Sequence, residues 1–149
     1  MSRAGALILL LGACAPVAGA PVAGAPVASG IVLDAGGLRP AGSALRVDFG
    51  RHRTGAVDAV SRLVGAGPAS ASACGEGVEE VRWANGLALT FRDAAFSGWT
   101  TRAGRGRPAV TAGGLGPGAP EAPLPEGLSA RFESGVVVAL SAGAPCIRG

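Results

Sequence analysis

Few side chains in this sequence could carry catalytic chemistry. The chain has one histidine, His52, which stands between Arg51 and Arg53 directly before a predicted helix. A general base must face a reacting group, whereas a histidine between two cations is expected on a solvated surface. Glu79 and Glu80 are adjacent, so on a strand their side chains point to opposite faces and cannot act together on one atom.

Metal binding is not indicated either. No group of histidine and cysteine residues has the spacing of a metal site. We therefore expect no catalytic residue, no metal and no cofactor, and the sequence identifies no small-molecule substrate. The prediction is that the protein is not an enzyme.

Arginine is the side chain most suited to binding here. All 13 basic residues are arginine, and the net charge is +3. Guanidinium groups recognise phosphate and carboxylate groups, so two clusters are candidate contacts for an anion or a partner: Arg46, Arg51, Arg53 and Arg62, and then Arg102, Arg105 and Arg107. They could rest on phosphate headgroups or meet an acidic partner. Nucleic acid is not expected, because a base-stacking platform needs exposed aromatic residues interleaved with basic ones, and only Arg82 and Arg92 are near the aromatics.

The N-terminal segment has the pattern of an export signal. Residues 1–13 contain one charge, Arg3, and then an apolar run that is shorter than the roughly 20 residues of a membrane span. The segment leads into Leu11-Gly12-Ala13-Cys14, which resembles the lipobox of bacterial lipoproteins. The resemblance implies cleavage before Cys14 and a lipid on Cys14 that anchors the chain in a membrane. Ordinary cleavage at a small-residue site is the alternative.

A proline-containing repeat follows the cysteine. Residues 15–29 read APVAG, APVAG and APVAS, a five-residue period that suits neither a helix nor a sheet. We expect residues 14–30 to be the lipidated cysteine and a linker. The repeat over residues 15–29 would reach roughly 45 Å, at about 3.1 Å per residue, and hold a folded body away from the lipid. The lipoprotein resemblance further implies, from Ala15 after Cys14, the outer membrane of a Gram-negative host, facing the periplasm.

The other two cysteines form an even pair. With Cys14 used for lipid, Cys74 and Cys146 remain in an exported chain, where disulfides persist. We predict a disulfide between them. It would close a loop of about 73 residues and stabilise the fold by roughly 4 kcal/mol in the chain-entropy model. The redox-active spacing Cys-x-x-Cys is absent.

Residues 74–101 contain both tryptophans and are predicted to form the centre of the fold. Val78–Trp83 and Leu87–Arg92 are rich in β-branched and aromatic residues, and the Asn-Gly between them indicates a hairpin. A three-residue loop is favoured, with Gly86 at a positive φ, because it pairs Trp83 with Leu87 and brings the large apolar side chains to one face.

A third strand, Phe96–Thr101, is expected after a turn at residues 93–95. Its register stays open. A three-residue loop would put Trp99 on the core face, whereas a two-residue loop would put Phe96 there. Both aromatics could also be buried if the sheet were covered on two sides.

The segment before this meander predicts two strands and a helix. Ile31–Asp34 is a short strand, residues 35–43 form a loop, and apolar residues alternate with charged ones over Leu45–Phe49. An amphipathic helix is expected over Thr54–Val64, with Thr54 as the N-cap and the helix ending at Gly65.

The segment after the meander is rich in glycine and proline. Residues 104–127 are expected to be irregular apart from a short strand at Ala109–Thr111. Beyond them, Leu128–Glu133 and Val136–Ser141 form a second hairpin, in which a two-residue loop pairs Phe132 with Val137. The return strand is apolar along its length, which indicates an interior position in the sheet.

These elements predict one small α+β domain over residues 31–149. Its core is an antiparallel β-sheet of about five or six strands in a meander and a hairpin. One short amphipathic helix packs on one face of the sheet, and the disulfide closes the structure.

The order of these motifs resembles that of a group of uncharacterised exported bacterial proteins. The shared features are a strand ending in glycine, a short helix, Leu-Val-Gly-x-Gly-Pro, a cysteine, Trp-x-Asn-Gly-Leu-x-Leu-x-Phe, Phe-x-Gly-Trp and a late cysteine, over about residues 44–101 and the C-terminal cysteine. More remotely, the helix followed by a meander is similar to small outer-membrane-assembly lipoproteins and to β-lactamase-inhibitor protein modules. Those resemblances imply binding or scaffolding, and they carry no site residue to this chain.

The leading hypothesis is an exported, lipid-anchored envelope protein without catalytic activity that binds or scaffolds another envelope component. Its partners would be the membrane, through the lipid, and an envelope protein. A secreted inhibitor-like module that blocks a target enzyme is the first alternative, and an enzyme of unknown type is the second.

Overall fold

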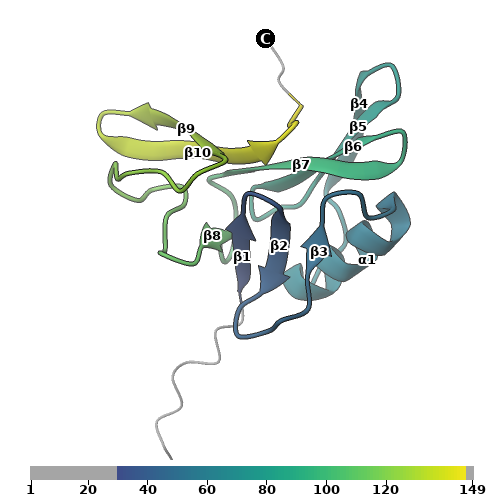
Figure 1. The fold of residues 1–149 in the computed structure, drawn as a ribbon, viewed down its shortest axis with the longest axis horizontal. Coiled ribbons are helices and arrows are strands. Elements are labelled where there is room, and N and C mark those ends of the chain that lie inside the picture. The colour runs from purple at the N-terminus through teal and green to yellow at the C-terminus, as the bar shows by residue number, and fades with distance from the viewer. Residues whose placement is uncertain (1–29, 147–149) are drawn as a thin grey trace, which may run out of the picture.

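The computed structural model describes residues 30–146. The signal sequence, Cys14 and the repeat linker lie outside the described residues. Within them the chain forms two β-sheets and one helix (Figure 1), so the predicted α+β class with a mainly antiparallel sheet is confirmed.

The larger sheet has six strands in the order β4-β5-β6-β7-β10-β9, and every neighbouring pair is antiparallel. Its strands are β4 (Ser70–Gly75), β5 (Val78–Arg82), β6 (Leu87–Arg92), β7 (Ala95–Arg102), β9 (Leu128–Glu133) and β10 (Val136–Gly143). The apolar β10 lies inside the sheet, and Phe132 pairs with Val137, both as predicted. The edge strand β4 was not predicted, because its serine, alanine and glycine residues have low β propensity.

The smaller sheet has the order β3-β2-β1-β8. It contains β1 (Ile31–Asp34), β2 (Gly37–Pro40), β3 (Val47–Asp48) and β8 (Val110–Thr111). The predicted loop over residues 35–43 is therefore wrong, since β2 pairs along the whole of β1. Its Gly-Leu-Arg-Pro sequence gives no strand signal, and the pairing with β1 makes it a strand. The strand predicted over Leu45–Phe49 is shortened to two residues.

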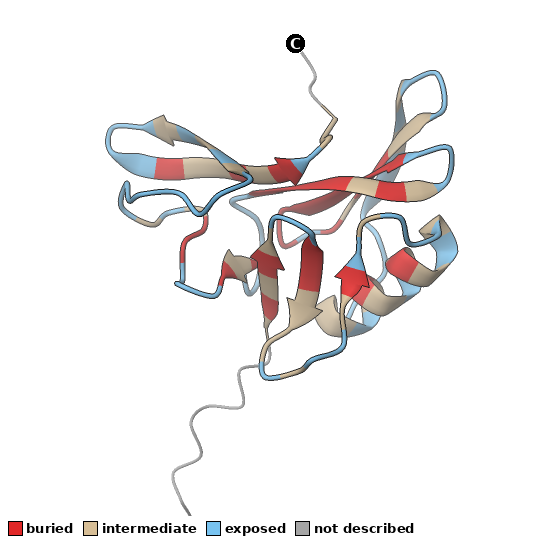
Figure 2. Cartoon of the chain, in the orientation of Figure 1, coloured by how far each residue is buried: buried red, intermediate tan, exposed pale blue. Residues whose placement is uncertain are grey.

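One face of the larger sheet, the core face, is covered by the smaller sheet and by α1 (Arg53–Val64), whereas the opposite face, the outer face, is not (Figure 1). Buried residues gather between these layers (Figure 2). Trp83 and Trp99 are both almost fully buried. Their indoles bind different covering elements, because Trp83 Nε1 donates to Ser61 Oγ on α1 at 3.3 Å and Trp99 Nε1 donates to the Asp34 carbonyl on β1 at 2.9 Å.

The predicted loop between β5 and β6 is confirmed. The backbone N–H of Trp83 donates to the Leu87 carbonyl at 2.9 Å, and Val81 pairs with Leu89. Gly86 has φ 90°, and a Cβ there would lie 2.0 Å from the Arg102 carbonyl oxygen. Only glycine fits that close approach.

Both registers considered for the third meander strand are present in β7. The loop has two residues, so Phe96 pairs with Phe91, and a β-bulge at Ser97 then lets Trp99 pair with Leu89. Because the bulge inserts one residue into the alternation, both aromatic side chains lie on the core face. Coverage of the sheet on two sides is not needed to bury them.

The N-cap of the helix lies two residues earlier than predicted. His52, not Thr54, is the N-cap, and its Nδ1 accepts a hydrogen bond of 3.4 Å from the Thr54 N–H. The start is displaced because residues before the helix pair with β7: His52 forms a bridge with Ala95, and the Phe96 N–H donates to the Arg51 carbonyl at 2.8 Å. The helix ends at Gly65 in the left-handed conformation, as predicted.

Candidate functional site

The first predicted arginine cluster is largely neutralised by acidic neighbours. Arg46 binds both carboxylate oxygens of Asp34, at 2.7 and 2.8 Å, and also contacts Asp48 at 2.7 Å. These bonds raise the pKa of Arg46 above its ordinary value. The hydrogen bond from Arg46 is the largest cause of a lowered pKa at Asp34. Arg46 is therefore engaged in holding β1 to the segment before α1.

Arg53 is also paired. It forms a two-pronged contact with Glu79 on β5, one prong at 2.8 Å, and its guanidinium lies 6.0 Å from the centre of the Phe91 ring. The hydrogen bond lowers the pKa of Glu79 and raises that of Arg53. Arg51 and Arg62 are exposed, at opposite ends of α1. The structure thus does not gather these four arginines into one anion site.

The three arginines of the second predicted cluster, Arg102, Arg105 and Arg107, do not lie together in the structure. Arg105 and Arg107 lie on an exposed loop, whereas Arg102 ends β7 with its side chain on the outer face. Arg102 is opposite Ala139 on β10, and Ala139 is in turn opposite Arg131 on β9. The structure therefore places Arg102 and Arg131 on either side of Ala139, and Arg131 was not part of the predicted cluster. Only the pairing of β7 with β10 could have indicated this neighbour.

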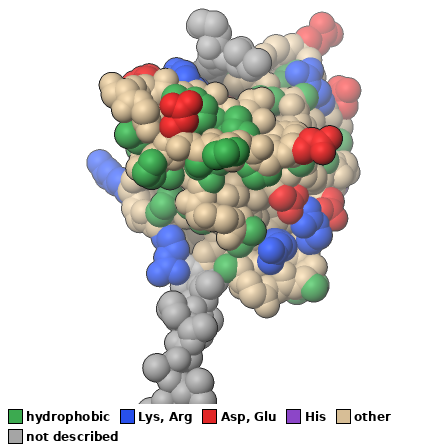
Figure 3. Space-filling model, turned by 60° about the vertical axis from the view of Figure 1, so that its left-hand side comes forward, with side chains coloured by type: hydrophobic (Ala, Val, Ile, Leu, Met, Phe, Trp, Pro, Cys, Tyr) green, Lys and Arg blue, Asp and Glu red, His purple; other side chains and the backbone are tan. Residues whose placement is uncertain are grey.

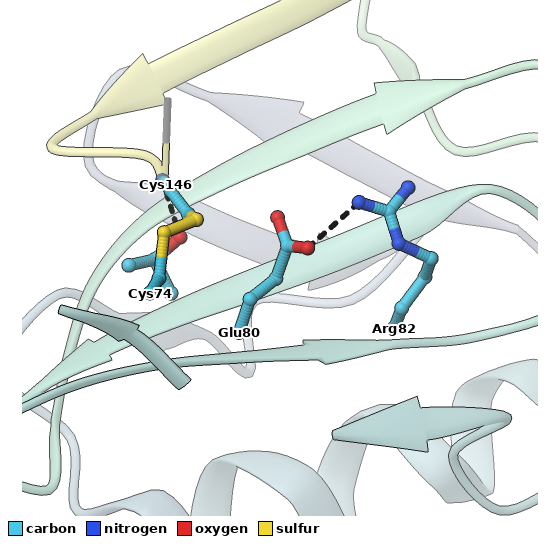
Figure 4. The surroundings of a disulfide bond; sticks show 5 residues. Cys74, Glu80, Arg82 and Cys146 are labelled. Carbon is cyan, nitrogen blue, oxygen red and sulfur yellow. Dashed lines mark hydrogen bonds and ion pairs between the residues drawn. A yellow bond between two sulfur atoms is a disulfide. The ribbon is translucent and has the colours of Figure 1, made fainter. Parts of the chain in front are cut away.

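The predicted disulfide between Cys74 and Cys146 is present, with the two Cα atoms 6.1 Å apart (Figure 4). It lies on the outer face, where the Cys146 N–H donates to Thr90 Oγ1 at 2.9 Å. Residues 144 and 145 cross directly over Gly98, since a Cβ there would lie 2.6 Å from the Ala144 carbonyl carbon. The disulfide thus fastens the segment after β10 across the sheet to β4.

The two adjacent glutamates lie on opposite faces of β5, as predicted. Glu79 faces Arg53 of α1, whereas Glu80 is on the outer face near the disulfide and accepts a 2.7 Å bond from Arg82 (Figure 4). Glu80 is only 5% exposed. Its one ion-pair partner offsets part of the cost of burying a carboxylate.

An apolar groove opens beside the start of β9. Its volume is about 650 Å³, and it is bounded by the ends of β1 and β8 and by the proline-rich loop before β9. We define the apolar groove by its principal lining residues, which are Leu33, Leu115, Ala119, Pro123, Pro125 and Leu128. Figure 3 shows hydrophobic side chains gathered on this side of the molecule next to acidic ones. Sequence reasoning described the 104–127 segment as irregular and did not identify it as the wall of a groove.

Two acidic residues, Glu121 and Glu126, line the same groove. Both are exposed, and neither is in an ion pair with an arginine in the described part of the chain. A third carboxylate at the groove, Asp34, is already bound to Arg46. The groove therefore combines an apolar wall with two available negative charges.

The described residues offer no further catalytic, metal or membrane-spanning candidate. His52 is exposed and serves as the helix N-cap. Among residues 30–146, no three histidine, cysteine, aspartate or glutamate side chains are placed to hold a metal ion. No helix in the same range is both long and apolar enough to cross a membrane.

No family model, curated protein or solved structure matches the chain. The resemblance to exported bacterial proteins therefore stays a prediction. The function has to be inferred from the residues of this chain alone.

Proposed function

We propose that the chain is an exported, lipid-anchored envelope protein without catalytic activity, which binds a partner protein in the apolar groove. The observation that carries this proposal is the groove itself, with its leucine and proline walls beside Glu121 and Glu126. Domains that bind an extended segment of another protein commonly hold its side chains in apolar grooves and pockets.

The groove's chemistry defines the partner. Apolar walls favour an aliphatic or aromatic side chain, because its burial removes apolar surface from water at about 25 cal/mol per Å². The unpaired carboxylates of Glu121 and Glu126 favour a cation beside that side chain. We therefore propose that the occupant is an extended segment of a partner protein, with an apolar residue next to lysine or arginine.

The predicted lipid anchor and linker support a location at the outer membrane, facing the periplasm. A lipid on Cys14 and a spacer over residues 15–29 would hold the folded body clear of the outer membrane in the periplasm. The groove could then meet a membrane-associated or periplasmic partner. This part of the proposal rests on the sequence, since residues 1–29 lie outside the described residues.

Site-specific photocrosslinking in cells tests the groove. A benzophenone side chain at Ala122, which lines the groove, is compared with one at Ala66, an exposed residue just after α1. We expect a crosslinked protein from position 122 only, lost in the Glu121→Arg/Glu126→Arg variant. Peptide mapping should place the crosslink in an apolar segment beside lysine or arginine. Equal crosslinking from both positions would contradict the proposal.

Metabolic labelling tests the anchor separately. Palmitate should label the wild-type chain and not a Cys14→Ser variant, and the intact mass of the mature protein should show a lipid on an N-terminal cysteine. Release into the medium of a mature chain that lacks Cys14 would favour the secreted inhibitor-like alternative.

A further inference from the structure

Two rows of side chains cross the outer face where β7, β10 and β9 lie side by side. The strand register places Thr100 opposite Ser141, and Ser141 opposite Ser129, which gives three hydroxyl groups in a row. In the neighbouring row, Ala139 separates Arg102 from Arg131. These five polar side chains line a single cleft of about 450 Å³, which we call the arginine cleft.

The dimensions of the arginine cleft suit one small anion. Neighbouring strands lie about 4.8 Å apart, so the two arginine Cα atoms are separated by roughly 10 Å. Ala139 fills little of the space between them, and two long side chains can bring their guanidinium groups to a common ion. The hydroxyl row forms the adjacent floor and supplies further hydrogen-bond donors.

The charges of both arginines are largely uncompensated. Arg131 lies 3.5 Å from Glu133, but both side chains are nearly two-thirds exposed, and such surface pairs contribute little. Among residues 30–146, no acidic side chain forms an ion pair with Arg102. Glu80, the buried carboxylate of this face, is bound to Arg82.

We propose that the arginine cleft binds a phosphate group, held between Arg102 and Arg131 over Ala139, with the serine and threonine hydroxyls as additional donors. Each guanidinium fork binds two oxygens, and a phosphate group offers enough oxygens for forks from both sides. Inorganic phosphate and phosphomonoesters offer three or more terminal oxygens to the two forks, whereas a carboxylate or a phosphodiester offers only two. The phosphate can come from a soluble phosphate compound or from a lipid headgroup.

This site is separate from the proposed protein-binding groove. Leu128 lines the apolar groove from the core side of β9, whereas the next residue, Ser129, lines the arginine cleft on the outer face. Substitutions in one cleft therefore leave the lining of the other unchanged. Failure of phosphate binding and failure of crosslinking in the groove can be told apart.

Calorimetric titration of the full chain with inorganic phosphate, at constant ionic strength, tests the proposal. We expect saturable binding, weakened at least about tenfold by Arg102→Gln and by Arg131→Gln, because each variant removes a charge-assisted fork. Arg131→Lys should also weaken binding, since lysine keeps the charge but loses the fork. Arg92→Gln is the matched control, because Arg92 is exposed on β6 away from the cleft, and it should bind like the wild type.

Vesicles distinguish the sources of phosphate. Binding to phosphatidic acid vesicles, whose headgroup is a phosphomonoester, that is lost in the Arg102→Gln variant assigns the cleft to a lipid headgroup. Binding of inorganic phosphate or glycerol 3-phosphate alone assigns it to a soluble compound. Absence of saturable phosphate binding, an equal loss in Arg92→Gln, or equally tight binding of acetate would overturn the proposal. The substituted arginines are on the surface, and a thermal unfolding scan verifies that each variant is folded.

Discussion

The indole N–H of Trp99 donates a 2.9 Å hydrogen bond to the backbone carbonyl of Asp34, 65 residues away in the sequence. Trp99 is in the middle of the larger sheet, and Asp34 ends the first strand of the smaller one. Because the indole is completely buried, water cannot replace this bond. The two sheets are thus joined by one directional contact inside the core.

Trp99→Phe should destabilise the fold by about 1–3 kcal/mol, because it leaves a carbonyl without its partner and opens a small cavity. Trp83→Phe is the matched control. Its indole donates at a longer 3.3 Å to the Ser61 hydroxyl oxygen. Ser61 is only half-buried, so water can donate to that oxygen instead, and a smaller loss is expected. Urea unfolding monitored by circular dichroism measures both values. Equal losses would contradict the special role of the bond between the sheets.

Deletion of Ser97 should lower the stability of the fold far more than substitution of Ser97 by alanine. The deletion removes the β-bulge, so either Phe96 or Trp99 must turn to the outer face, at a cost of about 3–5 kcal/mol for one large aromatic side chain. Ser97→Ala keeps the bulge and loses only the 3.2 Å bond to the Thr90 carbonyl, worth about 1 kcal/mol. Thermal unfolding compares the two variants. A deletion variant as stable as Ser97→Ala would refute this account.

Acid should weaken the fold through Asp34 and Glu79. The hydrogen bonds from Arg46 and Arg53 lower the pKa values of these carboxyls from ordinary values of 3.8 and 4.5. Their stabilising contribution is therefore complete above the unfolded-state pKa values and is lost as the pH falls through the lower folded-state values.

The measurement is the free energy of unfolding in urea at a series of pH values from neutral to about 2. In the wild type, this free energy should decrease as the pH falls. The decrease should be smaller in Asp34→Asn and in Glu79→Gln. Arg46→Gln should show the same smaller decrease as Asp34→Asn. Both carboxyls are more than a third exposed, so high salt should also reduce the effect. A decline unaltered in all three variants would show that other groups govern acid unfolding.

Reduction of the disulfide should lower the free energy of unfolding by about 4 kcal/mol, the chain-entropy value for a loop closed across a sequence separation of 72 residues. The Cys74→Ala/Cys146→Ala variant should show the same loss without reductant, and it should be insensitive to reductant. Urea midpoints with and without dithiothreitol measure the effect. If reductant lowered the midpoint of the double variant as well, the loss would not come from this bond.

Local sequence patterns were sufficient for the hairpins and the helix end. Asn85-Gly86 predicted the turn and the pairing of Trp83 with Leu87, and the alternation around Ser134-Gly135 predicted the pairing of Phe132 with Val137. Gly65 marked the end of α1. Each of these depends on the conformations of adjacent residues, and those are set by side chains within a few positions.

Of the predicted sites, the disulfide was predicted correctly and the grouping of the arginines was not. The cysteine pair followed from counting, and the structure contains that disulfide. The arginine clusters were grouped by proximity in the sequence, but Arg46 and Arg53 are engaged by Asp34 and Glu79 from distant strands. Ion pairs form between neighbours in space, which a list of charges does not reveal.

The sequence by itself determined the meander, the hairpin and the helix, because these depend on short-range patterns, and the cysteine pair, which followed from counting. The export signal and the lipid anchor stay predictions from the sequence. Only the tertiary structure decided that β2 is a strand, that Ser97 is a bulge and that Arg102 and Arg131 flank Ala139. The walls of the apolar groove were also decided there. The neighbour of Arg102 and the groove walls depend on segments far apart in the sequence coming together, and no local window of sequence contains those contacts. By contrast, β2 and the Ser97 bulge lie in tight hairpins with β1 and β6. Their residues carry no clear strand or bulge signal, so packing in the assembled sheets decides them.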